Sequence, residues 1–471
     1  MAEERVGSYF SALTVAALVT LPLVSCSGSS RPAEGESKNV LLITLDTTRA
    51  DRLSSYGHSR TTSPNIDALA ADGIRFERAM TTAAVTPISH ASILTGLNPY
   101  QHDVRVFFGP VGHFLTEEHP TLATLLRSNG WTTAAFISAY PASERFGLHW
   151  GFETFSSEID ESVMNRQPGL RPPKDGSWVR EPIGRAQRRA DHTTDEALAW
   201  LDTASSPFFL WLHYFDPHDP SLVPPREITE RFGAEQGSPS VRSDLYDAEI
   251  FYMDSQIGRI ISRLKERGSY ENTLIVVVAD HGQGLGDHGW GQHRLLYEEQ
   301  IRAPLILRLP EGERGRVVPE LVRIIDIAPT VLEFLGLETP EAVEGTSLRP
   351  LIEGRPEPGR IGYAEALNTL DAHAPDKLPE KQKDLLFSVA DGDWKLIYHR
   401  ELPENSELYH LSEDPGELDN VIEDHPAEAK RLMAWLSRSK AMEIELREPE
   451  GPIDPEALRK LEALGYLQAG D

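Results

Sequence analysis

The chain has little cysteine and few positive charges for its length. Cys26 is the single cysteine in 471 residues, so no disulfide can form within the chain and its stability must come from burial. Lys and Arg total 46 against 73 Asp and Glu, which gives a formal net charge of −27. The sequence therefore lacks the basic surface that nucleic-acid binding requires. An anionic ligand would need a local positive charge, such as a metal ion.

Long hydrophobic runs are also missing, apart from one near the N-terminus. That run, residues 9–21, is shorter than a membrane span and matches the apolar core of a signal peptide. The sequence LVSC at 23–26 resembles a bacterial lipobox, and a polar Ser/Gly/Glu stretch follows it. We expect a lipoprotein signal peptide at 1–25, a lipidated Cys26 and a polar tether at 26–37. A simple cleaved signal, or a short core helix with a stray cysteine, are the alternatives.

These features predict an exported protein of the bacterial cell envelope, in the periplasm or at the cell surface. No later segment approaches the roughly 18 apolar residues of a membrane helix. Contact with the membrane is therefore expected through the N-terminal lipid anchor only.

Apolar runs predict strands that are buried on both faces. They are 39–45, 208–215 and 273–279, and helical patterns such as 246–267 alternate with them. This alternation indicates an α/β fold with a large mixed, mostly parallel sheet between helices, which we place at residues 38–345.

The pattern changes after residue 345. A hairpin signal surrounds Asp391-Gly392-Asp393, and 427–446 is a charged amphipathic helix. We expect a small C-terminal antiparallel α+β subdomain at 346–471. Residues 160–190 and 366–384 read as loops.

Three of the predicted strands end in acidic residues, namely Asp46, Asp216 and the pair Asp280-His281. Ligands of open α/β sheets bind beyond the carboxyl ends of strands. Carboxylates and an imidazole brought together there can hold a cation. Alternatively, each aspartate caps the helix or turn that follows, and for one strand alone this explanation would suffice.

Longer motifs resemble the sulfatase family of the alkaline phosphatase superfamily. They are LDTTRAD at 45–51, SPNIDALA at 63–70, TPISHASILTG at 86–96, DHGQGLGDHG at 280–289, and WKLI at 394–397 with ELY at 407–409. The resemblance runs from about Asn39 to the C-terminus. It implies an alkaline phosphatase/sulfatase-like fold and the hydrolysis of ester bonds.

The resemblance also implies roles for single residues. Asp46, Asp280 and His281 match ligands of one divalent metal ion, and Thr86 stands at the nucleophile position at the start of a helix, where it would also touch the metal. The implied catalytic set adds three histidines. His90 stands where an arginine supports the nucleophile, His218 matches a substrate-binding or leaving-group histidine, and His293 lies where a side chain contacts the ester oxyanion. Each histidine taken alone could equally be a satisfied imidazole of the core or surface.

Thr86 departs from the family pattern in a way that decides the chemistry. Sulfatases oxidise a cysteine or serine to formylglycine, and threonine lacks the CH2–X group that this oxidation needs, so no formylglycine is expected. A metal can still activate a threonine hydroxyl, as in related phosphodiesterases and phosphoglycerol transferases. Water can hydrolyse a phosphothreonine. A sulfothreonine lacks the second hydroxyl by which hydrated formylglycine expels sulfate. Thr86 therefore favours phosphate esters.

Other departures concern the metal and the substrate. Thr47 stands where many sulfatases have an aspartate, and His281 where they have an asparagine. This shifts the expected metal from Ca²⁺, which stays possible, toward Mn²⁺ or Zn²⁺. A Lys-x-His motif is missing, because Phe136-Ile137-Ser138 occupies its place. A second metal would need further ligands, which Asp216, His218 and His293 could supply.

The sequence thus predicts a metal-dependent hydrolase of sulfate or phosphate esters. Its substrate would be a small molecule, a glycan or a lipid head group. One alternative is an envelope transferase, in which a second hydroxyl replaces water. The other is a metal-binding pseudoenzyme that recognises sulfated or phosphorylated glycans, which the missing Lys-x-His motif keeps open.

Overall fold

The computed structural model describes residues 38–157, 168–171, 179–182, 187–234, 241–311, 314–372 and 378–447. The predicted signal peptide and tether, with Cys26, lie outside these ranges and stay predictions. Within the described ranges, no helix has the length and apolarity that crossing a bilayer requires.

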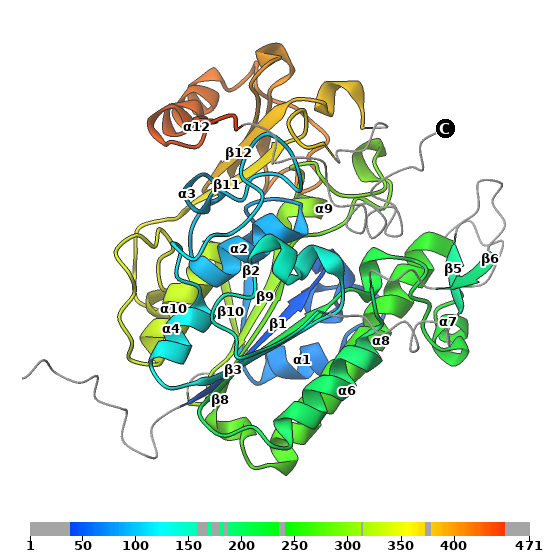
Figure 1. The fold of residues 1–471 in the computed structure, drawn as a ribbon. Helices are drawn as coiled ribbons and strands as arrows, with labels where there is room; N and C mark the ends of the chain where they lie inside the picture. The colour runs from blue at the N-terminus through cyan, green and yellow to red at the C-terminus, as the bar shows by residue number, and fades with distance from the viewer. Residues whose placement is uncertain are drawn as a thin grey trace, which may run out of the picture.

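A large sheet forms the centre of the molecule (Figure 1). Its strands follow the order β10-β2-β9-β8-β1-β7-β3-β4, and all run parallel to one another except β9. The strands are β1 (Asn39–Leu45), β2 (Ile74–Met80), β3 (Thr132–Ile137), β4 (Thr154–Ser156), β7 (Phe208–Tyr214), β8 (Thr273–Ala279), β9 (Arg302–Arg308) and β10 (Arg316–Arg323). The central strands β1, β7 and β8 are buried along their whole length, as their unbroken apolar runs require.

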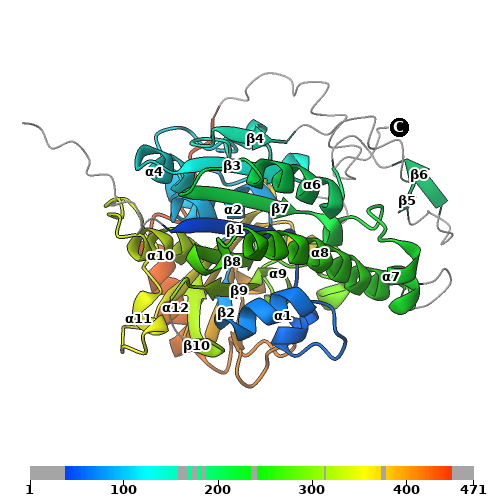
Figure 2. The same cartoon turned by 90° about the horizontal axis from the view of Figure 1, so that it is seen from below.

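Helices cover both faces of this sheet (Figures 1 and 2). On one face pack α1 (Pro64–Ala71), α6 (Ala190–Leu201) and α8 (Val241–Glu266). On the other lie α2 (Thr86–Thr95), α4 (Leu122–Ser128) and α10 (Ile327–Phe334). The predicted fold class, a mostly parallel mixed sheet between helices, is confirmed.

A second, smaller sheet lies at the C-terminal side of the chain (Figure 1). It is antiparallel in the order β11-β12-β13-β14, and α12 (Pro426–Arg438) packs on β12 and β13. Its strands are β11 (Ile361–Leu367), β12 (Leu385–Asp391), β13 (Trp394–His399) and β14 (Glu407–His410). The turn between β12 and β13 falls at Gly392, as predicted, and its φ of 61° suits glycine. The helix ends at Arg438, short of the predicted Leu446.

Several elements differ from the sequence prediction. β2 and β10 went unpredicted because β2 is only partly buried and β10 is an edge strand with mixed exposure. The stretch 160–190 was predicted to be a loop but holds the hairpin β5 (Pro168–Arg171) and β6 (Val179–Pro182). Helix α8 begins at Val241, earlier than the predicted residue 246. Short helices complete the elements, namely α3 (Pro99–His102), α7 (Arg226–Arg231), α9 (Glu298–Ile301) and α11 (Arg349–Ile352).

Candidate functional site

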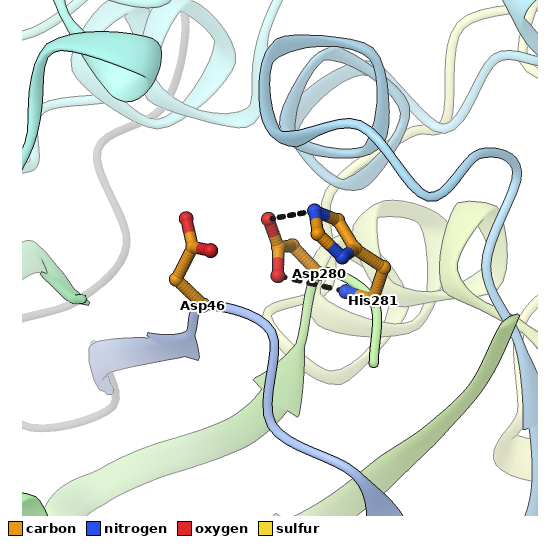
Figure 3. Close-up of side chains that lie close together, drawn as sticks. All are labelled: Asp46, Asp280 and His281. Atoms are coloured by element: carbon orange, nitrogen blue, oxygen red, sulfur yellow. Dashed lines mark hydrogen bonds and ion pairs between the residues drawn. The ribbon is translucent and has the colours of Figure 1, made fainter. Parts of the chain in front are cut away.

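Two neighbouring strands place Asp46 and Asp280 side by side at the carboxyl edge of the sheet. β1 and β8 are parallel partners, and Leu45 is in register with Ala279, so the next residue of each strand emerges at the same level. Figure 3 shows both carboxylates and the His281 ring gathered there. One ligand atom from each of these residues lies within 4.8 Å of the other two, and all three side chains are fully buried.

The carboxylates of this cluster are incompletely satisfied. Asp280 Oδ1 accepts the backbone N–H groups of Thr47 and His281, at 3.1 and 2.7 Å. Asp46 Oδ1 and Asp280 Oδ2 have no hydrogen-bond partner among the described residues. Burial raises the pKa of both side chains, and the charge of Asp46 raises the pKa of Asp280 further. Two adjacent buried carboxylates are costly without a compensating charge, so this donor set fits a divalent cation.

Thr86 brings its hydroxyl to the same cluster. It is the first residue of α2, follows the extended Val85 and precedes Pro87, which suits a first helical turn. Its Oγ1 donates to Asp46 Oδ2 at 3.2 Å and lies 3.4 Å from His281 Nε2. The predicted nucleophile therefore lies against two of the predicted metal ligands.

The ring of His281 is oriented toward this centre by its own backbone. Its Nδ1 lies 2.9 Å from the carbonyl oxygen of Gly282, which can only accept, so Nδ1 carries the hydrogen. Burial lowers the pKa of the imidazole and keeps it neutral. Nε2 therefore presents a lone pair to the cluster, as a metal-binding imidazole must.

His90 lies beneath the nucleophile and does not contact its hydroxyl. Its Nδ1 donates to the Thr86 carbonyl oxygen at 2.8 Å, and its Nε2 lies 3.0 Å from Thr44 Oγ1. Trp211 Nε1 donates to the same threonine oxygen at 2.9 Å, which leaves the Thr44 hydroxyl to donate to His90. Burial lowers the pKa of His90, so a neutral ring stands at the position where the resemblance implies an arginine. It fixes the backbone of Thr86 and adds no charge.

His218 and His293 contact each other beside the cluster. Their Nε2 atoms are 3.3 Å apart, and His293 Nδ1 donates to the Ala84 carbonyl oxygen at 2.7 Å. A neutral His293 then accepts at Nε2, and His218 donates from Nε2. The His293 ring also lies 4.6 Å from that of His281, centroid to centroid. Burial lowers the pKa of both His218 and His293. The structure thus brings both histidines beside the carboxylate cluster.

Asp216 stands apart from the other two strand ends. Its Oδ1 accepts the backbone N–H of Ala190 at 3.2 Å, at the first residue of α6. Burial raises its pKa to about 7. Asp216 thus bonds to a helix that precedes it in the chain, which differs from the capping of a following element weighed from the sequence, and its Oδ2 has no hydrogen-bond partner among the described residues. Asp46 and Asp280, by contrast, come together as a cluster.

His213 belongs to the site although sequence reasoning missed it. The residue lies inside β7 and is fully buried. Its Nδ1 accepts the backbone N–H of Ser138 at 3.3 Å, so Nε2 carries the hydrogen and donates to Asp46 Oδ2 at 3.0 Å. Ser138 stands where the Lys-x-His motif is missing. The only available signal was a polar residue inside an otherwise apolar strand, directly upstream of Asp216-Pro217-His218.

Comparisons with known proteins identify the family of this chain. The profile of the Sulfatase family matches residues 38–337, and that of N-sulphoglucosamine sulphohydrolase, C-terminal, matches residues 286–441. An arylsulfatase of Clostridium perfringens is 27% identical, with 90% of this chain and 97% of that protein covered. The multifunctional alkaline phosphatase superfamily protein PehA of Trinickia caryophylli is 26% identical, with 85% and 94% covered.

A solved structure extends the comparison to phosphorus chemistry. The phosphonate monoester hydrolase from Silicibacter pomeroyi is 26% identical and superimposes with a TM-score of 0.64, covering 86% of this chain and 95% of its own. The Sulfatase profile alone spans more than half of the sequence. On this evidence the chain belongs to the sulfatase family.

Proposed function

We propose that this sulfatase-family hydrolase cleaves phosphate esters, with Thr86 as a metal-activated nucleophile. The observation that supports this most directly is the position of the Thr86 hydroxyl. It lies 3.2 Å from Asp46 Oδ2 and 3.4 Å from His281 Nε2, in a buried cluster with two carboxylate oxygens still open to a ligand.

The donor set supports one divalent cation held by Asp46, Thr86, Asp280 and His281. Two carboxylate oxygens, a hydroxyl and one imidazole suit Mn²⁺ or Zn²⁺ better than Ca²⁺, which prefers oxygen ligands only. Such a cation lowers the pKa of the Thr86 hydroxyl and offsets the charge that builds on the transferred group.

The identity of the nucleophile supports phosphorus over sulfur. Threonine has a methyl group on Cβ and cannot become formylglycine. Direct attack would leave a covalent ester on Thr86, which water can hydrolyse when the transferred atom is phosphorus. The similarity to a phosphonate monoester hydrolase and to a multifunctional alkaline phosphatase superfamily protein is consistent with this chemistry.

The described side chains suffice for a balanced reaction. Thr86 Oγ1 attacks phosphorus, and its proton passes to Asp46 Oδ2. The bond from phosphorus to the leaving oxygen breaks, and His218, once protonated, donates to that oxygen from Nε2. Water then attacks the phosphothreonine and gives a proton to His218. The Thr86 oxygen leaves phosphorus and regains its proton from Asp46.

The test is a substrate screen of the protein loaded in turn with Mn²⁺, Zn²⁺ or Ca²⁺. Aryl sulfate, phosphate monoester, phosphodiester and phosphonate monoester are compared, with and without an added alcohol as acceptor. We expect hydrolysis of a phosphorus ester that Thr86→Ala lowers about a thousandfold, that Thr86→Ser partly keeps, and that leaves a phosphorylated Thr86 peptide after rapid quenching. Thr86-dependent hydrolysis of aryl sulfate alone would contradict the preference for phosphorus.

We also propose that the protein is exported and lipid-anchored through Cys26. The support is the sequence of residues 9–26, which resembles a lipoprotein signal. Labelling of bacterial cultures with a palmitate analogue should mark the wild-type protein and leave Cys26→Ala unmarked. Equal labelling of both proteins would contradict the anchor.

A further inference from the structure

Arg294 combines a strained backbone with an almost complete burial of charge. It follows His293 directly, its φ is 100°, and its side chain is 2% exposed. A positive φ of this size is unfavourable for a residue with a Cβ and is kept only where the surroundings impose it. Burying a guanidinium adds a second cost. Both costs fall on one residue next to the candidate active site.

The described contacts of Arg294 satisfy only some of the hydrogen-bond donors of its guanidinium. Nη1 pairs with Asp371, whose carboxylate also accepts the backbone N–H groups of Phe107 and Phe108, at 2.9 and 3.4 Å. The Arg294 carbonyl oxygen accepts from Asn368 Nδ2 at 3.2 Å. Nη2 is buried and has no hydrogen-bond partner in the part of the chain that the structure describes. A buried charged N–H without an acceptor is destabilising, so this group is free to donate a hydrogen bond to a ligand oxygen.

Arg294 is the chain neighbour of a residue that borders the catalytic cluster. That residue is His293, whose ring lies 4.6 Å from the ring of His281, centroid to centroid. His293 is fixed against the Ala84 carbonyl oxygen, two residues before Thr86. Arg294 is therefore close to the rings that border the nucleophile.

The cluster otherwise has no cationic side chain bonded to it. Among the described residues, no lysine or arginine makes a hydrogen bond or ion pair with Asp46, Thr86, Asp280 or His281. An anionic ester would thus meet a metal ion and little other positive charge.

We propose that Arg294 binds an anionic oxygen of the substrate's phosphoryl group through Nη2. This inference rests on the proposed function. Asp371 holds one amino group of the guanidinium, which sets its orientation, and the second amino group is left for the ligand. Arg294 thereby supplies the cationic contact that the missing Lys-x-His sequence at 136–138 does not.

The competing explanation is that Arg294 is purely structural. It pairs with Asp371, and the Asp371 carboxylate ties the 107–108 segment to the residues after β11. The backbone angle provides a second variant without the guanidinium, and phosphate affinity separates the two explanations. Glycine accepts a φ of 100° without strain. Arg294→Gly should therefore retain more thermal stability than Arg294→Gln, although both variants lose the guanidinium.

The experiment measures binding of inorganic phosphate to the metal-loaded full chain by calorimetry, together with the thermal midpoint of unfolding. We expect Arg294→Gln and Arg294→Gly to bind phosphate roughly 10- to 100-fold more weakly, the loss that follows from one charged hydrogen bond. The matched control is Arg308→Gln. Arg308 is also buried and paired with acids, but it lies at the opposite edge of the sheet, level with Ile275 at the start of β8. Arg308→Gln should lower the thermal midpoint of unfolding and leave phosphate affinity unchanged.

Two outcomes overturn the inference, and a third separates it from the proposed role of Thr86. Unchanged phosphate affinity in both Arg294 variants refutes it, and so does an equal loss of affinity in Arg308→Gln. If Thr86→Ala keeps full hydrolytic activity while phosphate binding still depends on Arg294, the proposed nucleophile is wrong and the binding site stands.

Discussion

Glu365 in β11 and the pair Asp46 and Asp280 are all fully buried carboxylates, yet their surroundings differ. Both oxygens of Glu365 accept from Arg105, at 2.9 and 2.6 Å, and Tyr363 donates to it as well. The remaining donors of Arg105 bond to the carbonyl oxygens of Glu443 and Ala441, each at 2.6 Å. At the sheet edge, by contrast, Asp46 and Asp280 each keep an oxygen without a partner among the described residues.

This difference in hydrogen bonding distinguishes the structural ion pair of Glu365 and Arg105 from the candidate binding site at Asp46 and Asp280. A buried pair whose donors and acceptors are satisfied within the chain needs no ligand. A buried pair of like charges with open acceptors stabilises the fold only when something else binds there. The chemistry of each position can therefore be tested by removing its charge and comparing the effects on activity and stability.

The largest effect is expected for Asp280→Asn. Loss of one ligand carboxylate should lower hydrolytic activity about a thousandfold or more. In the metal-free protein, the same change removes repulsion from Asp46 and should raise the thermal midpoint of unfolding. Activity assays and melting curves with and without chelator check both parts. A lower midpoint in the metal-free variant would mean that this carboxylate stabilises the fold by itself.

Glu365→Gln should do the reverse. The variant leaves the Arg105 guanidinium buried without its counter-charge, which typically costs about 3–5 kcal/mol. Urea unfolding should show this loss of unfolding free energy, whereas the metal affinity of the folded protein should stay near that of the wild type. A strong fall in metal affinity at constant stability would make the comparison invalid.

His213 tests how far the metal site depends on its surroundings. His213→Leu removes the donor to Asp46 Oδ2 and should weaken metal binding by about 10- to 100-fold. His213→Gln keeps an N–H donor and should recover part of that loss. Titration with Mn²⁺ or Zn²⁺ gives both affinities. Identical affinities for the two variants would mean that the hydrogen bond does not position Asp46.

The effect expected at Asp216 appears only as a dependence of stability on pH. Burial raises its pKa to about 7 in the folded protein, so the folded state binds this proton more tightly than the unfolded state does. Its contribution to stability is present below pH 4 and is lost as the pH rises toward 7, by on the order of 1 kcal/mol per pH unit. Asp216→Asn should flatten this part of the curve of unfolding free energy against pH. If the curve of the variant ran parallel to that of the wild type, the raised pKa of Asp216 would not be the cause of the pH dependence.

The sequence could predict the centre of the fold because its strands are buried on both faces. β1, β7 and β8 are runs of apolar residues that leave no other interpretation, and the acids that follow β1 and β8 form the cluster. β2 and β10 lie toward one edge of the sheet, where exposure alternates with burial, so their composition resembles a loop or a helix. Register between distant strands is a tertiary property, and no local pattern could tell that Asp216 would cap α6 instead of joining Asp46.

The same limit applies to residues that act through others. His213 looks like an ordinary core residue of a strand until its register beside Thr44 is known. Arg294 gives no sequence signal at all, since neither a positive φ nor an amino group without a partner can be seen in a one-dimensional pattern. Motif resemblance found the residues of the buried carboxylate cluster and missed His213 and Arg294, which lie around it.

The short loop ahead of α2 is held by a strand that is synthesised much later. The backbone N–H of Glu365 donates to the Thr82 carbonyl oxygen at 2.9 Å, and the Thr82 hydroxyl bonds to Ser92 Oγ within α2 at 2.8 Å. The bond from Glu365 can form only after β11 has left the ribosome, and it adds to the earlier bonds from Thr81 to Asp280 and Ile301. The smaller sheet therefore takes part directly in positioning Thr86, and a chain that ends before β11 should lack one of the bonds that hold this loop.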